Sequence, residues 1–392
     1  MKSLLVILTI LGLTYSTTNA QDSNEELVKK LVEKNILTQS EANEIMKEPG
    51  AGKQTFFQTT NKVRDSFNTP YMRFGGYGMY LYQYNQYAKN HHDMGTRVIF
   101  MSMSGNLTEH FRYFILGELS NPMIYEFYGE WMPSQAFKLR GGQYKIPLTF
   151  ENQISLTELE TVSNTRSVSS LIGMAGDPLQ YSDSRGINKT GRDIGIQASG
   201  SFLEMDTHYL LHYAAGVFQG TGINVRENNN AKDFSGSITL QPTKDFRVAG
   251  GYYAGKATVV LPIRFPSGNT TTFSQDNVRN RWTLSADYKS ERLYARTEWI
   301  HANDGGIKKE GLHGTVQYYI LPNKLNLVGK VDYFNNNKKR NSEVVDYIAA
   351  INYYFYERCR FMLNYTYSDY SKNWGNSHLS ENLIQAQMQI VF

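Results

Sequence analysis

Apolar and polar residues alternate along most of this 392-residue chain. The alternation is clearest in Glu381–Phe392, where every second residue is apolar: Ile384, Ala386, Met388, Ile390 and Phe392. Successive side chains of a β-strand point to opposite faces. The pattern therefore predicts a strand with one apolar and one polar face, which ends on an aromatic residue.

Similar alternation predicts about sixteen strands of about ten residues each, the pattern of a transmembrane barrel. The predicted strands lie near Tyr71–Gln83, Arg97–Gly105, Glu109–Leu119, Met123–Trp131, Ala136–Ile146, Arg192–Phe202, Thr207–Val217, Asp233–Gln241, Asp245–Gly255, Asn280–Tyr288, Glu291–His301, Glu310–Ile320, Lys324–Phe334, Val344–Tyr354, Glu357–Tyr367 and Glu381–Phe392.

The connections between these strands alternate in length, which supports an even number of antiparallel strands. Short turns are predicted at 106–108, 132–134, 242–244, 289–290, 321–323 and 354–356. Longer connections rich in Asn, Asp, Ser and Gly are predicted at 84–95, 219–231, 256–278, 335–341 and 368–380. We expect the short turns at the periplasmic end and the long connections outside the cell.

The longest interruption of the strand pattern is Pro147–Gly191. A stretch of this length without strands is usually functional or disordered in a compact domain. In a wide barrel we expect it to fold inward and narrow the lumen, and a mobile external lid is the alternative. Its middle part, Ile154–Met174, has spacing compatible with a helix.

The N-terminal part of the chain differs from the rest. Lys2, a short apolar run and Ala20 form a predicted signal peptide over 1–20, because about ten apolar residues are too few to span a bilayer as a helix. Residues 21–49 are predicted to form a short periplasmic helical hairpin, and 50–68 a linker. The barrel domain is predicted over 69–392.

The composition favours this interpretation over a soluble β-sandwich. The chain has 28 Tyr, 20 Phe and 32 Gly, and tyrosine suits a membrane interface, where one end of the ring is apolar and the other wet. The predicted fold class is thus all-β: a transmembrane antiparallel β-barrel of about sixteen strands with an inward-folded long third loop, localised in the outer membrane of a Gram-negative-type bacterium.

Placing the apolar face of each strand toward lipid sends a set of cations inward, because a charge facing the lipid costs about 2–4 kcal/mol near the midplane. The predicted lumen cations are Arg112, Lys138, Arg140, Arg247, Arg281, Arg296, Lys330, Arg358 and Arg360. Arg166 is the further candidate from the long segment. Such rings select ions by the sign of their charge. Neutralising Lys138 and Arg140 is expected to weaken anion preference most.

Acidic residues are also predicted to face inward, and these include Glu126, Glu130, Asp287 and Glu298. Arginines that pair with carboxylates on neighbouring strands stabilise the barrel wall, and the paired charges produce little net electric field in the lumen. Two interpretations of the cations therefore stay open: anion preference, or structural cross-strand pairs.

Two motifs resemble those of a known family. Leu139–Pro147 contains Gly-Gln-Tyr-Lys-Ile-Pro, which is similar to the G-Q-[FY]-K-x-P motif of the phosphate-selective porin O and P family, and Gly191–Gln197 is similar to its R-D-x-G motif. The helical lead at Leu31–Ile45 also resembles the start of that family. The long segment departs from the family pattern at Asn164–Arg166.

The resemblance implies a trimeric, anion-selective outer-membrane porin of sixteen strands with an inward-folded third loop. It places Lys145 and Arg192 where the chain enters and leaves that loop. The expected partners are small anions, with phosphate as the specific candidate, the lipid and lipopolysaccharide of the outer membrane, and two further copies of the chain.

Other classes of function are less well supported by the sequence. The histidines lack the spacing of a metal site or a catalytic triad, so neither an enzyme nor a cofactor is expected. The formal net charge of +4 is too small and diffuse for a nucleic-acid-binding face. Two alternatives remain open: a nonselective diffusion porin, and a plugged barrel that recruits a partner.

Overall fold

The computed structural model describes Val32 and residues 68–172, 191–227, 229–264, 270–375 and 378–392. The predicted signal peptide, the predicted helical hairpin except Val32 and almost all of the predicted linker lie outside the described residues. The chain divides into two units, Met1–Thr69 and Pro70–Phe392, and the description below concerns the second unit.

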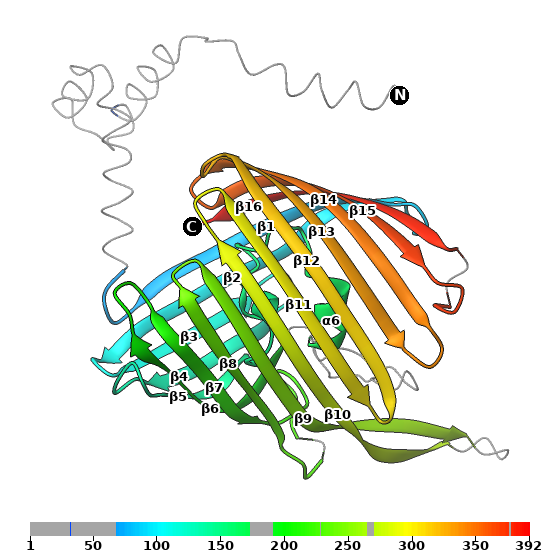
Figure 1. Cartoon of the computed structure of the whole chain (residues 1–392), viewed down its shortest axis with the longest axis horizontal. Helices are drawn as coiled ribbons and strands as arrows, with labels where there is room; N and C mark the ends of the chain where they lie inside the picture. The colour runs from blue at the N-terminus through cyan, green and yellow to red at the C-terminus, as the bar shows by residue number, and fades with distance from the viewer. Residues whose placement is uncertain (1–31, 33–67, 173–190, 228, 265–269, 376–377) are drawn as a thin grey trace. The chain divides into compact units, whose positions relative to one another are not determined.

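Sixteen antiparallel strands form a closed barrel, in which each strand pairs with its neighbours in sequence and β1 pairs with β16 (Figure 1). This confirms the predicted fold class. The strands are β1 (Arg73–Asn85), β2 (His92–Thr108), β3 (Phe111–Glu118), β4 (Met123–Trp131), β5 (Lys138–Lys145), β6 (Arg192–Glu204), β7 (Tyr209–Phe218), β8 (Asp233–Thr243), β9 (Phe246–Arg264), β10 (Thr270–Lys289), β11 (Leu293–Asp304), β12 (Ile307–Leu321), β13 (Leu325–Asn337), β14 (Ser342–Tyr356), β15 (Cys359–Tyr370) and β16 (Ser380–Val391).

The alternating sequence produces two different barrel faces. In β13, Lys330 and Asp332 are buried on the inner side, while Leu327 and Val331 on the same strand are 45% and 47% exposed on the outer side. Exposed apolar side chains recur on the outside of other strands, as at Ile238 and Leu284. An apolar outer band with a polar interior is the arrangement that lipid around a barrel requires. Neither helix in the described part of the chain is long and apolar enough to cross a bilayer.

The connections follow the predicted alternation, but several lie at shifted positions. The turn predicted at 106–108 lies at 109–110, because β2 continues to Thr108. The turn between β14 and β15 lies at 357–358, just after its predicted position. The predicted loop 256–278 is largely a hairpin, because β9 and β10 pair from Tyr288↔Phe246 to Thr270↔Arg264. Its polar composition resembles that of a loop, but β-branched residues such as Val259 and Thr271 favour strands. In Figure 1 both strands continue past the ends of their neighbours.

The long connection after β5 folds into the barrel, as predicted. Its described part, 146–172, contains the helices α5 (Phe150–Gln153) and α6 (Arg166–Leu171). These are shorter than the helical span expected over Ile154–Met174, and Met174 itself lies outside the described residues. Apolar residues of this connection pack against the inner wall in one buried cluster: Ile146, Leu148, Val168, Leu171 and Ile172 with Tyr253, Ile300, Ala302 and Phe334.

The contact between α6 and the wall depends on a glycine in β12. A Cβ added to Gly311 would lie 2.5 Å from the Cβ of Ser167 in α6. Gly311→Ala is therefore expected to displace α6 and destabilise the packed loop by about 1–3 kcal/mol. Gly314→Ala is the matched control, because Gly314 lies on the same strand with open space around it. Limited proteolysis should cleave the loop faster in G311A only; equal rates in both variants would contradict this packing.

Candidate functional site

The loop is held to the barrel wall by a buried ion network centred on Arg296. The Arg296 guanidinium donates to both carboxylate oxygens of Glu160, at 2.9 and 3.0 Å, and to Glu151 at 2.9 Å. Lys330 Nζ lies 3.4 Å from Glu151 and donates to Thr161 Oγ1 at 3.0 Å. The side chains of Arg296 and Lys330 have no solvent exposure. These two cations therefore fix the loop and are not exposed to a diffusing ion.

Glu151, in α5, lies within 4 Å of three basic side chains: Arg296, Lys330 and His313. Burial by itself would raise the pKa of the Glu151 carboxyl, but Lys330, His313 and Arg296 outweigh burial and hold this pKa well below its usual range. A lowered pKa means that the carboxylate stabilises the packed loop at every pH above the ordinary glutamate pKa of about 4.3, and that this stabilisation declines as the pH falls further.

We therefore expect the loop to stay packed from pH 8 to about pH 5 and to loosen only in stronger acid. Single-channel conductance should stay constant from pH 8 to about pH 5, and pepsin should cleave between 146 and 172 only in stronger acid. Loosening between pH 7 and pH 5 would contradict the network.

Two more of the predicted lumen cations point inward but are covered. Arg281 pairs with Asp304 at 2.7 Å and donates to the Leu171 carbonyl at 2.7 Å. Arg360 donates to the Leu159 carbonyl at 2.7 Å. Together with Arg296 and Lys330 they correct the sequence-based picture. Their inward direction agrees with the prediction, but the loop covers them, so they do not line open space.

Four other predicted cations are more accessible and each meets a carboxylate. Arg112 and Arg140 share Glu130, at 2.5 and 2.8 Å. Arg247 pairs with Asp287, and Arg166 of α6 pairs with Asp346 at 2.8 Å. The pairs of Arg112, Arg140 and Arg247 are the cross-strand pairs that the sequence left as an alternative to anion preference, whereas the pair of Arg166 joins α6 to β14.

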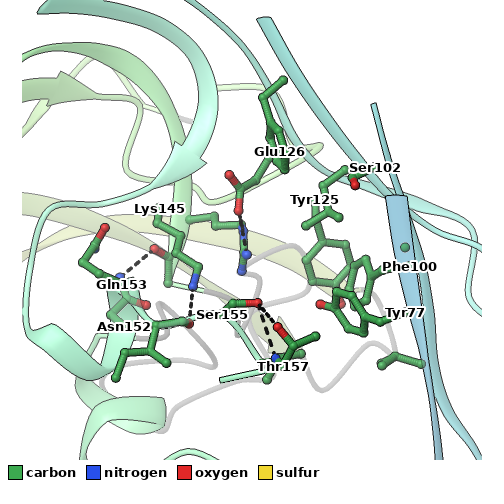
Figure 2. Close-up of a pocket in the computed structure, with 18 of the residues that line it drawn as sticks. Tyr77, Phe100, Ser102, Tyr125, Glu126, Lys145, Asn152, Gln153, Ser155 and Thr157 are labelled. Atoms are coloured by element: carbon green, nitrogen blue, oxygen red, sulfur yellow. Dashed lines mark hydrogen bonds and ion pairs between the residues drawn. The ribbon is translucent and has the colours of Figure 1, made fainter. Parts of the chain in front are cut away.

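A cavity of about 660 Å³ lies between the loop and the wall formed by β1 to β6, and we call it the loop cavity (Figure 2). The side chains around it include five cations and one carboxylate: Arg97, Arg140, Lys145, Arg192 and Arg358 with Glu126. Lys138 lies outside this lining, at the start of β5. The lining of this cavity therefore carries an excess of positive charge.

The two motif residues meet at this cavity. Lys145 and Arg192 are direct partners in the β5–β6 ladder, where the loop begins and ends. Arg192 donates to Glu126 Oε1 at 2.7 and 2.9 Å. Lys145 Nζ donates to the backbone carbonyl of Ile154 at 2.6 Å, which is a neutral partner.

Arg97 is a cavity residue that the sequence analysis missed. Its guanidinium donates to the Val162 carbonyl at 2.5 Å and to Gln387 Oε1 at 2.7 Å. The β1–β2 register shifts between Met79 and Tyr80, so that Arg97 is the extra residue of a β-bulge. Such a bulge re-aims a side chain, and here it places Arg97 inside. Strict alternation along β2 would point Arg97 toward lipid. The cost of a charge facing lipid was therefore the one signal in the sequence that Arg97 points inward.

Aromatic residues form the opposite side of the loop cavity (Figure 2). The rings of Tyr77 and Phe100 are 5.1 Å apart, and those of Phe100 and Tyr125 are 4.7 Å apart in an edge arrangement. The Arg192 guanidinium lies 5.4 Å from the Tyr125 ring centre. Tyr125 is also the extra residue of a bulge, in the β3–β4 ladder between Leu116 and Gly117.

A second cavity of about 600 Å³ lies near the short turns, and we call it the turn cavity. Its cations are balanced by carboxylates: Lys244, Arg247, Lys289 and Arg358 with Glu158, Glu160, Asp245, Asp287 and Glu357. Ile154, Thr157 and Arg358 line both cavities, which makes the two spaces adjacent. Arg358 lies in the turn before β15 and is 3.8 Å from Glu158. Positive charge is thus concentrated beside the loop and not at the turns.

Comparisons with known proteins bear on the fold. No family model matches the chain, and no curated protein matches it. Solved structures do: an anion-selective porin from Comamonas acidovorans has a TM-score of 0.61 at 11% identity, with 82% of this chain and 99% of that chain covered. OmpF of Salmonella typhi, in complex with daunomycin, has a TM-score of 0.58 at 11% identity over 82% and 97% of the two chains.

OmpT of Vibrio cholerae, described as outer-membrane expressed, has a TM-score of 0.56 at 11% identity over 82% and 97% of the two chains. OmpT in a trimer form matches with the same TM-score. At such low identity the likeness shows the fold. The resemblance to the phosphate-selective family stays a prediction. The chain has the sixteen-stranded barrel fold of bacterial outer-membrane porins.

Proposed function

We propose that this protein is an outer-membrane channel for the passive diffusion of small anions. The closed barrel and its apolar outer band support an outer-membrane location. One observation carries the anion preference: Arg97 and Lys145 line the loop cavity while their hydrogen bonds go to neutral oxygen atoms. Among the described residues, no carboxylate forms an ion pair with either side chain.

Uncompensated cations act strongly in a narrow, low-dielectric space. A unit charge about 6 Å from a permeant anion contributes about 2.8 kcal/mol at an effective dielectric constant of 20, before screening by salt. Most other inward-pointing cations pair with a carboxylate and therefore contribute less to the electric field in the lumen. The loop cavity is therefore the part of the lumen where anions are favoured, and phosphate, which the motif resemblance suggests, is one anion to test.

Planar-bilayer recording of the purified full-length protein tests this proposal against a plugged barrel. Stepwise, ohmic conductance in potassium chloride is expected, and it should persist when phosphate replaces chloride. A folded protein that inserts without conducting would instead favour a plugged barrel with a structural or interaction role.

We also propose that the protein forms trimers. Strands β3, β4 and β5 have eight, nine and eight residues. At about 3.3 Å per residue and a tilt of about 40°, eight residues span about 20 Å, less than the apolar band of about 25 Å. A neighbouring copy of the chain would cover the part of the barrel wall formed by these three short strands. Light scattering in detergent should give a mass of three chains, and a monomer would contradict the proposal.

A further inference from the structure

We propose that the loop cavity binds carboxylates that carry an aromatic ring in preference to small, fully hydrated anions. This inference rests on the proposed channel function and deepens it, because it names the class of solute that the cavity retains. One side of the cavity carries aromatic rings and the opposite side carries basic groups. The passage of chloride would require only the basic groups.

One side offers ring surfaces. Tyr77 and Tyr125 project from β1 and β4 into the space that faces Lys145 and the loop residues 152–157 (Figure 2). Phe100 of β2 is 1% exposed and packs against both rings. Ile154 adds apolar contact area. Rings in this arrangement stack on, or make edge contacts with, another aromatic ring, which gains more than area burial alone. A small inorganic ion would leave these apolar surfaces unused.

The other side offers charge. The basic groups of Lys145 and Arg97 donate to neutral oxygen atoms. The guanidinium of Arg192, which pairs with Glu126, lies over the Tyr125 ring. A carboxylate can bond to an ammonium or to a guanidinium fork. A ring with one attached carboxylate is therefore the smallest solute that satisfies both sides of the cavity simultaneously.

The backbone supports this assignment. Two bulges supply Arg97 to the cationic side and Tyr125 to the aromatic side. Regular alternation would turn both side chains toward lipid. Bulges occur where a strand must re-aim a side chain, and two of them serve this one cavity.

The test is blockade of chloride current through single channels of the full-length protein by benzoate, cyclohexanecarboxylate, acetate and phosphate. Benzoate is expected to half-block at a concentration about tenfold below that of acetate and phosphate, with cyclohexanecarboxylate between them. Tyr125→Leu and Tyr77→Leu should each raise the benzoate value about threefold or more and leave the acetate value unchanged. Tyr347→Leu, on the lipid-facing side of β14, is the control.

Each outcome is decisive. Equal half-blocking concentrations for benzoate and acetate would overturn the inference while a normal anion preference upheld the proposed function. Equal values for benzoate and cyclohexanecarboxylate would overturn the aromatic part of it. A channel without anion preference would overturn the proposed function. Folding of every variant is checked by its heat-dependent mobility in detergent gels.

Discussion

Arg296→Gln is expected to release the inward loop from the barrel wall. The substitution removes the cation shared by Glu151 and Glu160, both of which are buried. Breaking a buried ion pair by removing one partner costs about 3–5 kcal/mol. The loss falls on the loop, because the strand ladders that close the barrel do not involve this side chain. Single-channel current should become larger and noisier, and proteases should cleave between 146 and 172.

Arg340→Gln is the matched control, since Arg340 is an exposed arginine in the turn after β13. It should leave both current and proteolysis unchanged. If R296Q shows the quiet current and protease resistance of the unmodified protein, the ion network does not hold the loop.

The double variant Arg97→Gln/Lys145→Gln is expected to lower the ratio of chloride to potassium permeability by about tenfold, which corresponds to about 1.4 kcal/mol. The reason is that these two side chains line the loop cavity and donate to neutral oxygen atoms, and among the described residues neither forms an ion pair with a carboxylate. The expectation from the sequence was Lys138 and Arg140. The structure changes that choice, because Arg140 is paired with Glu130 and Lys138 lies outside the lining of both cavities.

Lys339→Gln/Arg340→Gln removes the same charge from an exposed turn and should change the permeability ratio little. Reversal potentials of the two double variants under one salt gradient provide the comparison. Equal shifts in both would mean that diffuse surface charge, and not the loop cavity, sets the selectivity.

The barrel could be predicted from the sequence because its wall separates lipid from a polar interior. That separation forces Leu327 and Lys330 to opposite faces, and the alternation of apolar and polar residues shows it along the strands outside the bulges. It also gives the inward direction of Arg296, Arg281 and Arg360 correctly. The fold therefore needed only short-range information.

The site could not be predicted in the same way because it depends on contacts between distant residues. Arg360 is covered by the Leu159 carbonyl, 201 positions away, and no local pattern reveals this pairing. The bulges at Arg97 and Tyr125 break the alternation on which the prediction relied. Only the motif resemblance pointed to Lys145 and Arg192, which the structure places side by side at the loop cavity.

The reversal potential of the unmodified channel under a tenfold gradient of potassium chloride reports directly whether anions or cations permeate more easily. We expect a potential of the sign that marks chloride as the more permeant ion, because Arg97 and Lys145 line the loop cavity without ion pairs among the described residues. A reversal potential at zero, or one of the opposite sign, would contradict it.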